Sequence, residues 1–169
     1  MKKLIIALLA VLLLATPALA ELKIGTVDLQ KALNTSKAGV AAKAEISEKV
    51  KKLEAEFKTK QDNLLKLKTE LEKQSLLLSD SAKADKERDY QQEVKELQRF
   101  QKDAKDELQQ RDAEHTKRII NELLGILQKI GKDGGYTLII EKNQGGLVYA
   151  DMTVDLTDQL IKAYDAAQK

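Results

Sequence analysis

The sequence predicts an α+β protein, mainly α, in which a long antiparallel coiled-coil hairpin projects from a small body of β-strands. Three observations support this fold class. No glycine or proline occurs between Gly39 and Gly125, and that stretch is rich in good helix formers. Its apolar residues recur with the alternating spacing of three and four that is typical of coiled coils. Strand-like segments occur only before and after the stretch.

Residues 1–20 have the pattern of a cleaved secretory signal peptide. Lys2 and Lys3 precede an apolar run over residues 4–15, and Ala18 and Ala20 supply the small side chains that signal peptidase requires. The run is shorter than the roughly 20 residues that span a bilayer, so we expect export rather than stable membrane insertion. The chain has no cysteine, which excludes disulfides and thiolate metal ligands. Export without disulfides favours the bacterial periplasm.

The charge balance argues against nucleic acid as a partner. The whole chain has 29 Lys and Arg against 27 Asp and Glu, and the two surplus basic residues are Lys2 and Lys3 of the leader. The mature chain is therefore formally neutral, whereas nucleic-acid binding needs a basic surface. The six aromatic residues (four Tyr and two Phe) are not clustered into a stacking platform.

The predicted hairpin arm covers residues 41–124, with its tip at 79–82. If the chain folds back about Asp80 and Ser81, Leu67 faces Val94 and the polar Lys60 faces the polar Gln101. Apolar residues meet one another in this way along both helices, which predicts one continuous hairpin. Its seam comprises Val50, Leu53, Phe57, Leu64, Leu67 and Leu71, followed by Tyr90, Val94, Leu97, Ala104 and Leu108.

The seam becomes polar near the base of the arm. The same pairing places Val50 opposite Arg111 and Ile46 opposite His115. Long helices bend where such interruptions occur, so we expect hinge-like flexing near Val50 and Arg111.

The predicted body combines residues 21–40 with residues 125–169. Segments 22–28, 136–142 and 146–150 are predicted strands, the last two joined by the turn-forming sequence NQGG. Residues 29–33 are a predicted short helix, and Asp155 is a predicted cap of a C-terminal helix. This core is too small to stand alone, so we expect a homo-oligomer. The residues expected in the oligomer body are Ile24, Val27, Ile119, Leu123, Leu127, Leu138, Ile140 and Val148.

Three consecutive leucines, Leu76, Leu77 and Leu78, precede the predicted tip. Under the pairing above they lack apolar partners within the hairpin, which makes them candidates for contact with a protein client. In the alternative interpretation Leu78 closes the last heptad and its neighbours pack under the turn, since isolated exposed apolar residues are common.

No catalytic, metal or cofactor site is predicted. The single histidine, His115, lies on the seam rather than beside a glycine-rich loop, and no phosphate-binding or nucleophile motif occurs. The acidic residues alternate with lysines as they do on solvated helix faces. We therefore expect a protein that is not an enzyme.

The segments KIGTVDLQKALNTSKAG (residues 23–39) and GYTLIIEKNQGGLVYADMTVDLTDQLIKAY (residues 135–164) resemble the Skp (OmpH-like) periplasmic chaperone family. The resemblance covers the whole mature chain. It implies a homotrimer in which three chains form a β-barrel body and three helical hairpins surround a cavity. It also implies an ATP-independent holdase that keeps unfolded outer-membrane β-barrel proteins from aggregating.

Two questions stay open beside this resemblance. The arms of the family are described as basic, which would suit lipopolysaccharide, but here basic and acidic residues are equally frequent between residues 41 and 125. No lipopolysaccharide-binding residues are therefore assigned. A structural or adaptor periplasmic coiled-coil protein that docks one fixed partner would need the same rigid hairpin, and the two functions would differ in what the tip binds.

Overall fold

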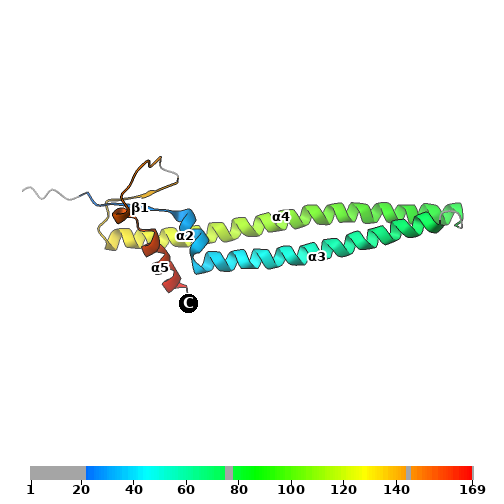
Figure 1. The fold of residues 1–169 in the computed structure, drawn as a ribbon, viewed down its shortest axis with the longest axis horizontal. Helices are drawn as coiled ribbons and strands as arrows, with labels where there is room; N and C mark the ends of the chain where they lie inside the picture. The colour runs from blue at the N-terminus through cyan, green and yellow to red at the C-terminus, as the bar shows by residue number, and fades with distance from the viewer. Residues whose placement is uncertain (1–21, 75–77, 144–145, 169) are drawn as a thin grey trace, which may run out of the picture.

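The computed structural model describes residues 22–74, 78–143 and 146–168. In this part of the chain a long two-helix arm extends from a small α/β body, as Figure 1 shows. The predicted α+β class, mainly helical with a long hairpin, is confirmed. The predicted signal peptide at residues 1–20 lies outside the described residues. None of the described helices is both long and apolar enough to cross a membrane.

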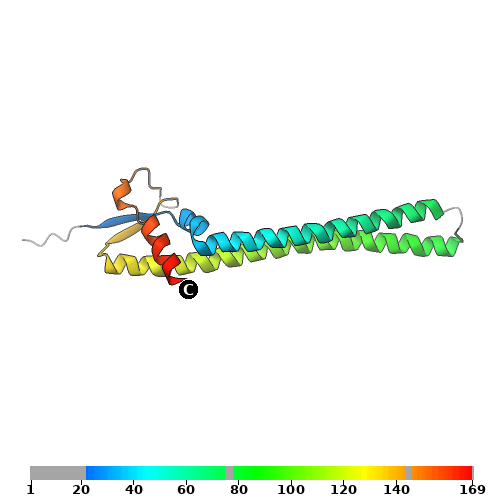
Figure 2. The same cartoon turned by 60° about the horizontal axis from the view of Figure 1, so that its bottom comes forward.

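The arm consists of α3 (Lys37–Gln74) and α4 (Asp80–Asp133), which lie side by side in both views of the molecule (Figures 1 and 2). The 54 residues of α4 correspond to about 80 Å at 1.5 Å per residue. Only its first part pairs with α3, because its last turns continue into the body (Figure 2). The helix that forms half of the arm therefore also anchors it.

The predicted tip at residues 79–82 is wrong in position. Helix α4 already begins at Asp80, and Ser79 is its N-cap, with its side chain accepting a hydrogen bond from Ala82 N at 3.3 Å. The Ser-Asp-Ser sequence resembles a turn, but the same residues favour helix starts, where Ser caps free amides and Asp complements the helix dipole. The connection therefore lies before residue 80.

The register of the hairpin differs from the predicted one for the same reason. Arg111, expected opposite Val50, instead forms an ion pair with Glu45 at 3.6 Å. Glu107 pairs with Lys49 at 3.0 Å rather than facing Glu54. Each contact is displaced toward the N-terminus of α3. The two apolar stripes still meet, since Val50, Leu53 and Phe57 of α3 and Ala104 and Leu108 of α4 line one groove.

The body is built around β1 (Ile24–Val27), which pairs in parallel with β2 (Leu138–Glu141). The register places Ile24 beside Leu138 and Val27 beside Glu141. On its other side β1 forms a single bridge between Thr26 and Asp155. Both edges of β1 are thus occupied, which leaves the outer edge of β2 without a ladder among the described residues.

The predicted strand at residues 146–150 does not form. Among the described residues Gly146–Ala150 belongs to no ladder, Gly146 has a φ of 64°, and Val148 is 99% exposed. Residues 144–145 of the predicted turn lie outside the described part. The alternating pattern of this segment suits a strand, but a strand requires a hydrogen-bonded neighbour. This chain provides none among its described residues.

Three short helices complete the body: α2 (Leu29–Thr35), the 3-10 turn η1 (Met152–Val154) and α5 (Thr157–Ala167). Leu156, Leu160 and Tyr164 line the buried side of the C-terminal segment. Asp155 precedes α5 and accepts hydrogen bonds from both the backbone N–H and the hydroxyl of Thr157, at 2.9 and 2.6 Å.

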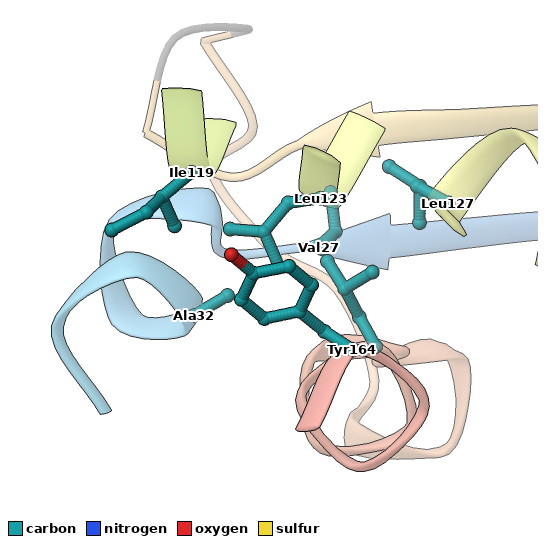
Figure 3. Close-up of a cluster of buried hydrophobic side chains, with 7 residues drawn as sticks. Val27, Ala32, Ile119, Leu123, Leu127 and Tyr164 are labelled. Carbon is teal, nitrogen blue, oxygen red and sulfur yellow. The ribbon is translucent and has the colours of Figure 1, made fainter. Parts of the chain in front are cut away.

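The core lies where β1, α2, α4 and α5 converge. Figure 3 shows the ring of Tyr164 among the side chains of Val27, Ala32 and Leu123. The Tyr164 hydroxyl donates a 2.6 Å hydrogen bond to Glu122, so the phenol is satisfied although only 1% of the residue is exposed. This cluster fixes the base of α4 and with it the direction of the arm.

Candidate functional site

The seam of the arm is only partly covered by its two helices. Among the predicted seam residues, Leu53 is buried, whereas the others are half-buried. Two helices alone cannot enclose a stripe of large side chains, because each apolar stripe is wider than the line of contact. The seam residues therefore contact the facing helix and remain accessible from the side.

Two open grooves expose the seam. The groove nearer the body has a volume of about 320 Å³ and lies between Val50, Leu53 and Phe57 of α3 and Ala104 and Leu108 of α4. A second groove of about 240 Å³ lies farther along the arm. It is lined by Gln61, Leu64, Leu65 and Lys68 of α3 and by Tyr90 and Leu97 of α4.

Two apolar residues of this surface, Phe100 and Leu65, lie outside the predicted seam. Phe100 lines the groove nearer the body, and the Lys60 ammonium lies 5.6 Å from the centre of its ring. Leu65 is 63% exposed. The heptad pattern assigns neither residue to the seam because each lies one position beside it. The sequence signal that could have identified both residues is a large apolar side chain directly beside a seam position.

The predicted leucine cluster is only partly described. Leu76 and Leu77 lie outside the described residues. Leu78 is half-buried, and its backbone N–H donates a 3.0 Å hydrogen bond to Gln74 O. Leu78 therefore continues the hydrogen bonding of α3 by one step and keeps part of its side chain accessible.

Ion pairs connect the two helices of the arm. Lys49 contacts Glu107 at 3.0 Å, and nearer the tip Lys86 contacts Glu70 at 4.0 Å. Hydrogen bonds from Lys49 and Arg111 hold the pKa of Glu107 below its usual value. At the base, the predicted weak point at Arg111 is bridged, since this side chain contacts both Glu45 and Glu107.

His115 belongs to the same charged group. Its Nε2 lies 3.4 Å from Glu45, and Arg118 Nη2 lies 2.8 Å from its Nδ1. The imidazole thus connects α3 and α4 where the arm joins the body. Within the described residues no cluster of His, Asp and Glu has the arrangement of a metal site.

The predicted oligomer residues divide into two groups. Val27, Ile119, Leu123 and Leu127 are buried inside the chain's own core, so they stabilise the body from within rather than contacting a second copy. Exposed apolar side chains of the body are instead Leu22, Ile24, Leu138, Val148, Tyr149 and Met152. Ile140 is half-buried. The sequence pattern could not separate these groups, because both occupy alternating apolar positions.

Comparisons with known proteins agree with this architecture. A family model described as outer membrane protein (OmpH-like) matches residues 23–164. An uncharacterised protein of Aquifex aeolicus (strain VF5) is 26% identical over 145 residues, which cover 86% of this chain and 87% of that protein. The crystal structure of a candidate outer membrane chaperone (OmpH-like) from Caulobacter crescentus CB15 superposes with a TM-score of 0.81. It is 18% identical, and the match covers 90% of this chain and 89% of the other.

Proposed function

Because the chain belongs to the OmpH-like outer membrane protein family, we propose that it is an ATP-independent periplasmic holdase chaperone. In this role it binds unfolded outer-membrane β-barrel proteins between its helical arms and prevents their aggregation. The signal pattern at residues 1–20 directs the chain to the periplasm. No catalytic step and no cofactor are part of this function.

The half-buried seam of the arm is the observation that supports holding most directly. A holdase needs apolar surface that contacts many sequences without burying any of them deeply. Grooves lined by Val50, Phe57 and Leu108, and by Leu64 and Leu97, provide such surface in an otherwise charged helical pair. Contact that is shallow and repeated along the arm favours weak, multiple binding over one tight site.

The exposed apolar side chains of the body support assembly into a homotrimer. Val148, Tyr149 and Met152 are between 81% and 99% exposed. Large apolar side chains that are exposed together on a small body usually mark an interface. The outer edge of β2 and the segment at residues 146–150 each lack a hydrogen-bonded strand partner among the described residues. Neighbouring copies would satisfy both and would place several arms around one space.

The function is tested by diluting a urea-unfolded outer-membrane β-barrel protein into buffer that contains the mature chain and no nucleotide. We expect light scattering from the barrel protein to fall as the chain is added, and unrelated barrel sequences to be protected alike. An adaptor that docks one fixed partner would instead protect one sequence and saturate with it. Unchanged scattering for every barrel protein would rule out the holdase function.

A further inference from the structure

The two flanks of the arm differ, and the difference follows the heptad positions. On α3, Lys49 and Glu70 are separated by a multiple of seven residues and therefore lie on one flank of the seam. Their partners on α4, Glu107 and Lys86, are separated in the same way. One flank of the hairpin is thus crossed by ion pairs near the base and near the tip.

Other cross-helix contacts lie on this ion-paired flank. Phe100 precedes Glu107 by seven residues and shares its row, and the Lys60 ammonium covers its ring. Nearer the body, Glu45 contacts Arg111. Charged side chains therefore cross this flank near the base and near the tip, and between them Phe100 lines the groove nearer the body.

The residues of the opposite flank line both grooves. Glu54, Gln61 and Lys68 are seven residues apart, form the row on the other side of the seam, and line the two grooves. Lys105 is their counterpart on α4. Leu65 lies beside this row and is 63% exposed. We call this surface, defined by Glu54, Gln61, Leu65, Lys68 and Lys105, the open flank.

We propose that the open flank binds extended client segments whose apolar side chains alternate with polar ones, as in the strands of outer-membrane β-barrels. This inference rests on the proposed function and identifies the part of the arm, and the kind of client segment, that it uses. The ion pairs of the other flank take no direct part in binding.

The geometry of the grooves suits an extended segment. Their α3 residues are centred about 11 positions apart, which is about 16 Å along a helix. In a strand, side chains on one face follow one another every 6 to 7 Å, roughly. Each groove spans about two helical turns and so receives one or two side chains of the same face, while the opposite face stays in water.

An extended occupant also fits the break between the grooves better than a third helix would. An added helix would need an unbroken apolar stripe, but the polar Lys60 interrupts the α3 side of the seam between the two grooves, and the polar Gln101 lies within the groove nearer the body. The rim combines Glu54 with Lys68 and Lys105, so it presents no single sign of charge. Such a rim accepts uncharged or mixed segments and repels neither sign strongly.

The proposal is tested by site-specific photo-crosslinking in the mature full-length chain. A benzophenone side chain is placed at Gln61 or Lys105 on the open flank. Matched controls carry it at Asn63 or Glu93, which are exposed and belong to the rows of the ion-paired flank. With a urea-unfolded outer-membrane barrel protein, we expect adducts at Gln61 and Lys105 at least about fivefold above the controls.

Equal or reversed yields would overturn the assignment of the open flank, while protection from aggregation would still support the proposed function. Adducts between two copies of this chain at Gln61 or Lys105, formed with and without client, would also overturn it, because the flank would then be an interface between copies. If neither adducts nor protection are seen, the proposed function fails as well.

Two substitutions give an independent readout. Leu65→Asp and Asn63→Asp add the same charge to the same turn of α3, but only Leu65 lies on the open flank. We expect L65D to weaken client binding about fivefold to tenfold, which is the scale of losing a contact that half-buries one leucine on binding. N63D should change client binding less than twofold. Circular dichroism checks that both variants keep their helices. Equal effects would contradict the proposal.

The kind of segment is tested by competition between two synthetic peptides of the same composition. One carries its apolar residues at alternate positions, and the other carries them at the three- and four-residue spacing of an amphipathic helix. We expect the alternating peptide to compete more strongly with a bound barrel protein. Stronger competition by the helical peptide would overturn the proposed client geometry.

Discussion

At the scale of single residues, two glycines of the long helices have opposite roles. A Cβ added to Gly39 would lie 1.7 Å from the backbone carbonyl oxygen of Leu33, where α2 turns into α3. Gly125 is exposed on α4, and a Cβ added there would meet no other atom within 4 Å. Gly39 therefore allows two backbone segments to approach closely. Gly125 lowers the stability of its helix, and no close contact requires a glycine there.

These environments predict opposite effects of the same substitution. Gly39→Ala should lower the free energy of unfolding by more than about 2 kcal/mol, because backbone rather than a flexible side chain must move. Gly125→Ala should raise it by about 0.5 to 1 kcal/mol, which is the helix preference of Ala over Gly. Urea unfolding followed by circular dichroism measures both. A stabilised G39A variant would contradict the described corner between α2 and α3.

Asp155 joins the strands to α5 through Lys142 and Thr157. Burial alone would raise the pKa of Asp155, but the hydrogen bonds from Lys142 and Thr157 outweigh it and lower the pKa to about 2 from 3.8. The folded state therefore binds this proton less readily than the unfolded state. The resulting stabilisation is present above about pH 4 and is lost as the pH falls toward 2.

We expect Asp155→Asn to lower the free energy of unfolding by about 1 to 2 kcal/mol at neutral pH and to reduce the loss of stability between pH 4 and pH 2. Asp158→Asn is the control, since Asp158 pairs with Lys31 on an exposed surface, where ion pairs contribute little. Thermal unfolding at several pH values measures both. A D155N variant with the acid dependence of the parent chain would contradict this role.

At the scale of elements, the ion pair between Lys49 and Glu107 defines the register of the hairpin. Lys49→Glu or Glu107→Lys alone should lower the melting temperature, because like charges then face each other. The double variant should recover most of the loss. In the register predicted from the sequence, Glu107 faces Glu54 instead of Lys49. Glu107→Lys would then be compensated by Glu54, without a second substitution at Lys49. Double-variant cycles of melting temperature distinguish these two registers.

The sequence predicts the elements of the arm well and their ends poorly. Apolar periodicity predicts both helices and their facing stripes, because 3.5-residue spacing is a property of the chain itself. The turn is misplaced because Ser79 and Asp80 suit both a loop and a helix start. The segment at residues 146–150 has strand composition, but whether it pairs depends on a neighbour that its own sequence does not encode.

The candidate site divides in the same way. Which residues form the seam follows from the heptads, whereas which flank is open depends on how Lys49, Lys60 and Lys86 reach across to α4. These cross-helix contacts depend on the register of the hairpin, which the heptad pattern predicts incorrectly. Similarly, burial of Val27 and Leu123 within the chain, and exposure of Val148, follow from packing rather than from alternation.

At the scale of the whole molecule, the fold separates two tasks. The buried core lies at the base of α4. The two grooves lie along the paired helices of the arm, which extend away from the body (Figure 2). Helix α4 belongs to both parts, so the arm is held by packing of Ile119, Leu123 and Leu127 rather than by a loop. This packing sets the direction of the arm relative to the body.

The most direct test of the holdase function is the mass and state of the complex with an unfolded outer-membrane barrel protein. The mature chain and the client are mixed without nucleotide, and light scattering is recorded during gel filtration. We predict one soluble peak that contains about one client per trimer of this chain, with the client still unfolded by circular dichroism. A client that precipitates, or that elutes apart from the chain, would contradict the account.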